Sequence, residues 1–104
     1  MTAQQVISAI IYDRRGMILS IGKNSYVKTH TLQAKFAKKL GLEDKVYLHA
    51  EIDAILRCQD LSRAHRIFIT RFNKHGKPAL AAPCVICAEA IRALTQIKII
   101  EFTK

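Results

Sequence analysis

The sequence predicts an α/β fold, a three-layer α/β/α sandwich around a mixed sheet, in one domain spanning residues 1–104. Runs of β-branched apolar residues alternate along the chain with segments whose apolar residues recur at helical spacing. The first such run, residues 6–12, is apolar on both faces, which is typical of a central strand with helices on both sides of its sheet. A chain of this length can bury one small core, so we expect a single domain.

The first half of the chain predicts a β-hairpin followed by a helix. Residues 6–12 form the first strand, residues 13–16 supply the turn, and residues 17–21 form the second strand. Between residues 31 and 40 the apolar side chains fall four positions apart, and lysines occupy the opposite face. We therefore expect a short amphipathic helix with a basic outer side.

The second half predicts helix, strand, helix and strand. A second helix begins near His49, and residues 66–72 alternate as a strand. Turn residues then mark a loop up to Pro83, and a third helix begins at Cys84. Residues 97–102 alternate again as the last strand. The expected order is therefore β-β-α-α-β-α-β, with a largely parallel second half.

Composition and charge narrow the class of protein. The chain has 17 lysine and arginine residues against 8 acidic ones, a formal net charge of +9. This surplus would attract phosphates or nucleic acid, but it equally describes a solvated basic surface. No apolar run approaches the roughly 20 residues of a membrane span, and residues 1–5 lack the features of a secretory signal. We therefore expect a cytoplasmic protein without a membrane segment.

The cysteines predict a metal centre. Three cysteines, two of them spaced Cys-x-x-Cys, fit a metal or redox site better than a disulfide framework. A helix presents Cys84 and Cys87 on one face, and its N-terminus favours thiolates. His49, at the start of its own helix, could face this pair. Three protein ligands leave one position of tetrahedral Zn²⁺ open, as in catalytic sites, so we predict His49, Cys84 and Cys87 as zinc ligands.

Glu51 is the predicted catalytic residue. It lies two positions after His49 and is not needed as a metal ligand. Zinc lowers the pKa of a bound water to near neutral, which favours attack on an electron-poor ring carbon. A carboxylate beside the metal can take a proton from that water and deliver protons to the substrate.

The segments His49-Ala50-Glu51 and Pro83-Cys84-Val85-Ile86-Cys87 resemble the signature of the cytidine and deoxycytidylate deaminase superfamily. The resemblance covers almost the whole chain, because the expected order of elements matches that fold. It implies a cytidine deaminase-like fold with bound Zn²⁺. It also implies a hydrolase that converts cytosine to uracil in a small-molecule nucleoside or nucleotide and releases ammonia.

The same resemblance suggests which residues meet the substrate. The segment Gly22-Lys23-Asn24 looks like the family's substrate-contacting loop, in which the asparagine touches the sugar. Asn24 is therefore a substrate-binding candidate. Ala50, inside the signature, and Tyr26, two positions after Asn24, are the further candidates.

The sequence resembles a minimal version of the family's fold. It does not include the helix that precedes the first strand in many members, nor the elements that follow the fourth strand. Those parts often carry substrate-selecting and subunit-contacting residues, so substrate and assembly stay open. We expect a homo-oligomer, because so short a version has little core of its own and relatives commonly assemble.

Three alternatives remain. The basic surplus, with Arg71, Lys74 and Lys77, is compatible with a deaminase of cytosine or adenine in a polynucleotide. A noncatalytic zinc domain that binds nucleic acid or a protein belongs to another class, and Glu51 argues against it. A thioredoxin-like redox pair shares the Cys-x-x-Cys spacing, but it gives no role to His49.

Overall fold

The computed structural model describes residues 6–25, 28–42, 47–73 and 75–104. The bounds of β1 and β3 agree with the predicted strands, whereas β2 begins one residue later and runs two residues further, and β4 begins two residues later. The helices begin within one residue of their predicted starts, and a short 3₁₀ turn that the sequence did not suggest precedes β3. The elements are β1 (Val6–Tyr12), β2 (Ile18–Lys23), α1 (Thr31–Lys39), α2 (Ala50–Arg57), η1 (Leu61–Arg63), β3 (Arg66–Phe72), α3 (Val85–Leu94) and β4 (Ile99–Phe102).

The four strands form one mixed sheet in the order β2-β1-β3-β4. β1 pairs antiparallel with β2 on one side and with β3 on the other, and Ile10 lies opposite both Ile21 and Phe68. β3 and β4 run parallel, as expected for strands joined through a helix. The mixed sheet predicted from the sequence is therefore confirmed, with β1 inside it.

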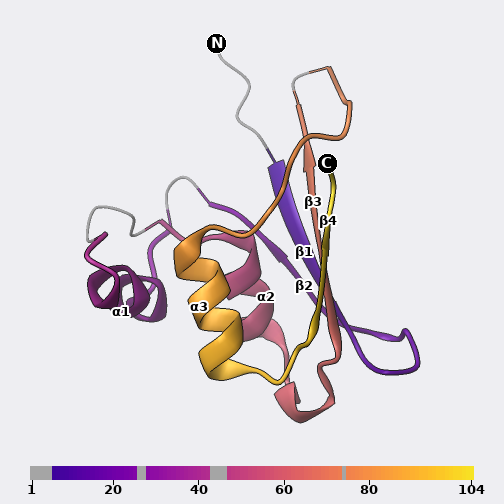
Figure 1. Cartoon of the computed structure of the whole chain (residues 1–104), viewed down its shortest axis with the longest axis horizontal. Helices are drawn as coiled ribbons and strands as arrows, with labels where there is room; N and C mark the ends of the chain where they lie inside the picture. The colour runs from indigo at the N-terminus through magenta and orange to yellow at the C-terminus, as the bar shows by residue number, and fades with distance from the viewer. Residues whose placement is uncertain (1–5, 26–27, 43–46, 74) are drawn as a thin grey trace.

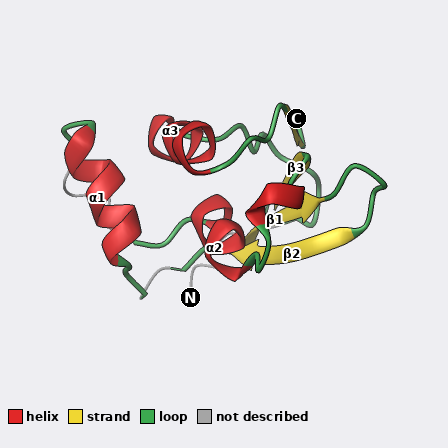
Figure 2. Ribbon diagram, turned by 90° about the horizontal axis from the view of Figure 1, so that it is seen from below, coloured by secondary structure: helices red, strands yellow, loops and turns green. Residues whose placement is uncertain are grey.

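All three helices of the described ranges lie on the same side of the sheet (Figures 1 and 2). On β1 the side chains that face α2, Ala9 and Ile11, are fully buried, whereas Val6 on the opposite face is 58% exposed and Ile10 is half-buried. The described residues thus form two layers where the sequence predicted three. The apolar pattern of the first strand indicated a central strand correctly, but the expected helices on both sides of the sheet are wrong for the described residues.

The helices cover a hydrophobic core that has two parts. One part fills the space between the sheet and α2, around Ile11, Ile67 and Ile69. The other lies between the helices, where Ile52 of α2 meets Cys87 of α3. The three α-helices have eight to ten residues, and no helix within the described ranges is long and apolar enough to cross a bilayer.

Strand β2 and helix α2 approach each other closely at Gly22. A Cβ atom built there would lie 2.8 Å from Cα of Ala54 and would overlap the Ala54 backbone nitrogen and the Ala50 carbonyl oxygen. Beside this contact, the Ser20 hydroxyl donates a 2.8 Å hydrogen bond to the Ala54 carbonyl. Only a residue without a side chain allows this approach, which fixes the first turn of α2 against the end of β2.

Candidate metal centre

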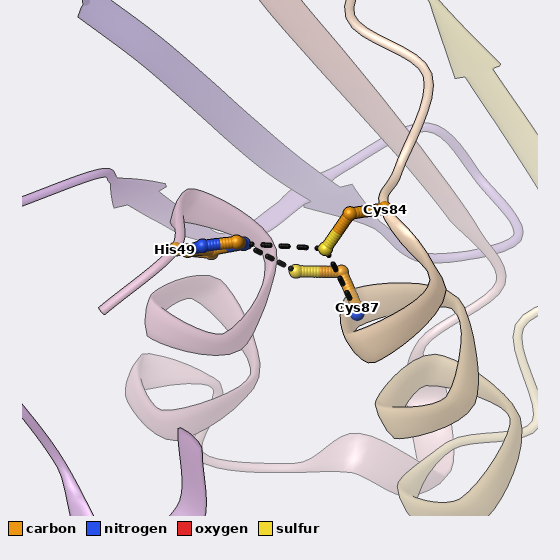
Figure 3. A group of neighbouring side chains, drawn as sticks. All are labelled: His49, Cys84 and Cys87. Carbon is orange, nitrogen blue, oxygen red and sulfur yellow. Dashed lines mark hydrogen bonds between the residues drawn. The ribbon is translucent and has the colours of Figure 1, made fainter. Parts of the chain in front are cut away.

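Three potential ligands meet where α2 and α3 begin (Figure 3). His49 is the N-cap residue of α2, Cys84 is the N-cap residue of α3, and Cys87 lies in the first turn of α3. Nδ1 of His49 is 3.2 Å from Sγ of Cys87 and 3.4 Å from Sγ of Cys84. The three ligand atoms all lie within 4.8 Å of one another. The predicted ligands are therefore brought together by two segments far apart in the sequence.

Local interactions hold these residues in position. The imidazole of His49 makes no capping hydrogen bond to its own helix, and the His49 backbone N–H donates to Oε1 of Gln33 at 3.3 Å. Gln33 is fully buried on α1, so α1 braces the segment that leads into α2. On α3, Sγ of Cys84 accepts the backbone N–H of Cys87 at 3.5 Å, which fixes the orientation of the Cys84 thiol.

The donor set and its spacing fit a tetrahedral metal ion. Zinc bonds of about 2.3 Å to sulfur and about 2.0 Å to nitrogen place the two ligand atoms roughly 3.6 Å apart. The observed nitrogen–sulfur separations, 3.2 and 3.4 Å, need only a slight opening to reach this value. The cluster could thus bind a metal ion, and two sulfurs with one imidazole form a donor set that suits zinc.

The protonation of the two cysteines is coupled. The hydrogen bond from the Cys87 thiol, followed by contacts with His49 and the Cys87 backbone N–H, lowers the pKa of Cys84 to about 4 against the effect of burial. The same hydrogen bond, together with burial, raises the pKa of Cys87. The opposite directions of these two pKa shifts favour one thiolate beside one thiol at neutral pH. Metal binding would release the remaining proton, because zinc binds thiolates.

Glu51 lies in the first turn of α2 beside the three ligands, but it does not belong to the ligand group. Its side chain is only 5% exposed. Burial raises the pKa of the Glu51 carboxyl, and its own backbone N–H, the Cys87 thiol and His49 oppose this effect. The structure thus provides a buried carboxyl group beside the candidate metal centre, where the sequence predicted one.

A cavity of about 480 Å³ opens beside the metal centre. Glu51 and two of the predicted substrate-binding residues, Asn24 and Ala50, are in its wall. Oδ1 of Asn24 accepts the Ile7 backbone N–H at 2.9 Å, so this side chain also closes the end of the β1–β2 hairpin. Tyr26 lies outside the described residues. The cavity is lined by Ile7, Asn24, Ser25, Tyr47, Leu48, His49, Ala50, Glu51, Ala82 and Cys84.

Two residues of this region were missed by the sequence analysis. Tyr47 is half exposed and lines the cavity, and its position two residues before His49 in an extended segment could have suggested a shared face. Asp53 is buried on α2, where Oδ2 accepts the Lys23 backbone N–H at 2.9 Å and pairs with Arg57 at 3.0 Å. Asp53 therefore ties the end of β2, next to Asn24, to the helix that carries Glu51.

Comparisons of the chain with protein-family models and with curated protein sequences found no match. What the centre does must therefore be argued from its own residues.

Proposed function

We propose that the protein is a zinc-dependent hydrolytic deaminase that converts cytosine to uracil in a nucleoside or nucleotide and releases ammonia. The observation that carries this proposal is the buried Glu51 beside a three-ligand cluster that opens on a cavity. A structural zinc site is normally closed by four protein ligands and needs no neighbouring carboxylate. Three ligands and one buried carboxyl group instead match the requirements of hydrolysis.

The chemistry divides between the metal and the protein. Zinc, when bound, supplies Lewis acidity and lowers the pKa of water at its open position. Glu51 takes a proton from the water that attacks the amine-bearing ring carbon and passes it to the ring nitrogen. It then passes the second proton of that water, from the hydroxyl group added to the carbon, to the leaving amine. The carbon–oxygen bond forms, the carbon–nitrogen bond breaks, and water and cytosine become uracil and ammonia.

The cavity supports a small substrate. Its volume of about 480 Å³ falls within the usual range for small-molecule sites. The ring of Tyr47 offers a surface for a base to stack on, and Asn24 and Ser25, which follow the end of β2, add polar groups to the wall. A nucleoside or nucleotide therefore suits the cavity, and we keep it as the proposed partner.

The decisive experiment replaces Glu51 with glutamine, which has the same shape but cannot exchange protons as a carboxylate does. We expect Glu51→Gln to retain its metal, because Glu51 is not one of the ligands. Ammonia release from cytidine and deoxycytidylate should fall about 10²–10⁴-fold, the usual contribution of one acid–base group. Metal content by elemental analysis and ammonia release on the same preparations provide the two measurements.

A matched control is Glu101→Gln, since Glu101 is on β4, where its carboxylate pairs with Arg66 at 2.7 Å. This variant should keep full turnover. If Glu51→Gln released ammonia as fast as the wild type, the assignment of Glu51 would be wrong.

Measuring ammonia release from a wider set of compounds distinguishes the other functions considered for this chain. Ammonia release only from single-stranded oligonucleotides would favour a polynucleotide deaminase. Bound zinc without ammonia release from any cytosine, adenine or guanine compound would favour a noncatalytic zinc domain.

Arg71 gives the polynucleotide function little support, because its guanidinium donates to the Leu80 carbonyl at 3.3 Å, and Lys74 lies outside the described residues. The homo-oligomer and the cytoplasmic location stay predictions.

A further inference from the structure

A second cavity, of about 700 Å³, lies at the other end of β1 from the metal centre. The turn after β1, the η1 segment and the chain before β4 form its walls. Ile7 lines the first cavity and Asp13 the second, and six positions of extended chain separate them by about 20 Å. The second cavity is therefore a separate site. It is lined by Asp13, Arg14, Arg15, Ser62, Arg63, Ala64, His65, Gln96 and Lys98.

The wall of this cavity is strongly basic. Arg14, Arg15, Arg63 and Lys98 are basic side chains, and Asp13 is the one carboxylate among the lining residues. Arg14, Arg15 and Lys98 make no ion pair with any of the described residues, although all three are exposed. Like charges gathered around one hollow repel one another, so an anionic ligand would relieve this repulsion.

The carboxylate of Asp13 is already fully engaged. Oδ1 accepts the backbone N–H groups of Arg15 and Met17, both at 2.9 Å, and Oδ2 pairs with Nη2 of Arg63 at 2.9 Å. Asp13 is only 6% exposed. The negative charge of Asp13 therefore holds the turn and the guanidinium group of Arg63 in place. It does not neutralise Arg14, Arg15 or Lys98.

Hydrogen bonds join the three walls, so the cavity exists without a ligand. The Asp13–Arg63 pair joins the turn to η1, and the backbone N–H of His65 donates to the Tyr12 carbonyl at 2.9 Å. The Gln96 amide donates to the Ser62 carbonyl, which joins η1 to the segment before β4. A preformed site loses less conformational entropy on binding than one that must be ordered first.

We propose that this cavity binds a small molecule that carries two or more phosphate groups. Guanidinium groups match phosphate oxygens in a bidentate manner, and Arg14 and Arg15 supply two of them beside Lys98, whereas the guanidinium of Arg63 is held by Asp13 in the same wall. Several cations around one hollow suit a polyphosphate better than a single phosphate. The site shares no lining residue with the metal centre, so binding there does not depend on the proposed deaminase activity.

Calorimetric titration of the whole protein with tripolyphosphate, at about 150 mM salt, tests the proposal. We expect saturable binding of one ligand per chain. The double variant Arg14→Ala/Arg15→Ala should weaken it about tenfold or more, since two charge-assisted contacts are lost. Arg14→Lys/Arg15→Lys keeps the charge but removes the guanidinium groups that can bind phosphate in a bidentate manner, so we expect an intermediate loss of affinity.

The matched control is Lys35→Ala/Lys38→Ala, which removes the same charge from the exposed face of α1. It should leave the affinity for tripolyphosphate within about twofold of the wild type. Equal weakening by the two double variants would overturn the proposal, because it would mean binding to the overall positive charge. Absence of saturable binding to the wild type would overturn it as well.

Two further ligands identify the source of the phosphates. A nucleoside triphosphate that binds more tightly than tripolyphosphate, and loses affinity in Arg14→Ala/Arg15→Ala, would support the site and make a nucleotide its ligand. Equal affinity for the two would support a site that reads only the phosphates. A single-stranded oligonucleotide that binds far more tightly than either, with a steep salt dependence, would overturn a small-molecule site in favour of nucleic acid.

Discussion

At the scale of single residues, Asp13 shows how one carboxylate organises a turn. The hydrogen bond from the Met17 backbone N–H lowers the pKa of Asp13; burial acts against this, and the Arg15 N–H and Arg63 lower it further. The ionised form is therefore the one that stabilises the fold. Its contribution is present above the ordinary pKa of 3.8 and is lost as the pH falls through the lower pKa of the folded protein.

We predict that Asp13→Asn lowers the unfolding temperature at pH 7, because the variant keeps the side-chain shape but loses the charged acceptor. The difference in unfolding temperature between the variant and the wild type should shrink as the pH falls below 3.8, since the wild-type carboxyl group then loses its charge. Thermal unfolding followed by circular dichroism at pH 7 and pH 3 measures this. A difference of the same size at both pH values would contradict the role given to ionised Asp13.

The residues of the metal centre could be predicted because they lie in short sequence motifs. Histidine and cysteine are uncommon residue types in this chain, Glu51 follows His49 at an informative spacing, and the structure brings His49, Cys84 and Cys87 together. Asp53 could not be predicted in the same way. Its partner is a backbone N–H at Lys23, on another element, and nothing in the sequence around Asp53 reports that contact.

At the scale of elements, the contact between β2 and α2 sets the position of the centre. Gly22 lies against the backbone of Ala50 and Ala54, and the N-cap residue of the same helix is His49. A methyl group at Gly22 meets helix backbone, which cannot move aside as a flexible side chain could. The added volume must therefore displace the first turn of α2.

We predict that Gly22→Ala destabilises the fold by about 1–3 kcal/mol and weakens metal binding, because the displaced helix carries one ligand and Glu51. The matched control is Gly16→Ala, which meets open space but has a φ of 86°. That variant should cost about 1 kcal/mol from backbone strain and leave the metal affinity unchanged. Chemical denaturation and zinc titration check both variants, and unchanged zinc affinity in Gly22→Ala would show that the β2–α2 contact does not position the ligands.

The helices and strands were predictable where the hydrophobic periodicity and the turn residues agreed. β1 and β3 matched because both are rich in β-branched residues and are followed by clear turn residues, and the helices matched because apolar residues recur at three- and four-residue spacing. The three layers predicted from these patterns were wrong for the described residues. An apolar residue on a strand indicates that burial is favourable, but the covering element must come from elsewhere in the chain, and the described helices cover one face only.

At the scale of the whole molecule, a metal ion at the centre would join two helices from different halves of the chain. His49 is the N-cap residue of α2, and Cys84 is the N-cap residue of α3, beyond the intervening strand β3. The unfolded chain does not hold these groups together. Metal binding therefore favours the folded state by mass action.

We predict that removal of zinc by a chelator lowers the unfolding temperature. At a free zinc concentration of about 100 times the dissociation constant the stabilisation is about 2.7 kcal/mol, which corresponds to roughly 10 °C or more for a domain of this size. The effect should vanish in Cys84→Ser and persist in Cys58→Ser, because Cys58 is a buried cysteine outside the ligand group. Calorimetric scans with and without chelator measure it, and a chelator effect that Cys84→Ser leaves intact would place the metal elsewhere.

The second cavity is a property of the whole molecule that the sequence did not indicate. Its basic residues come from three separate segments, each of which resembles an ordinary charged turn or loop. Only the pairing of β1 with β2 and β3, and of β3 with β4, gathers these segments at one end of the sheet. The net charge of +9 was compatible with affinity for anions and equally with a solvated basic surface, and it did not indicate where on the surface the positive charge is concentrated.

The inner position of β1 also bears on how the chain folds. One neighbour, β2, follows it directly, whereas the other, β3, comes from the far half of the sequence. A short hairpin forms within microseconds, but pairing with a distant strand must first close a long loop and is slower. His49 precedes β3 and the two cysteines follow it. We therefore expect the ligand set to be complete only after the slowest pairing has occurred, so that metal uptake marks the end of folding rather than its nucleus.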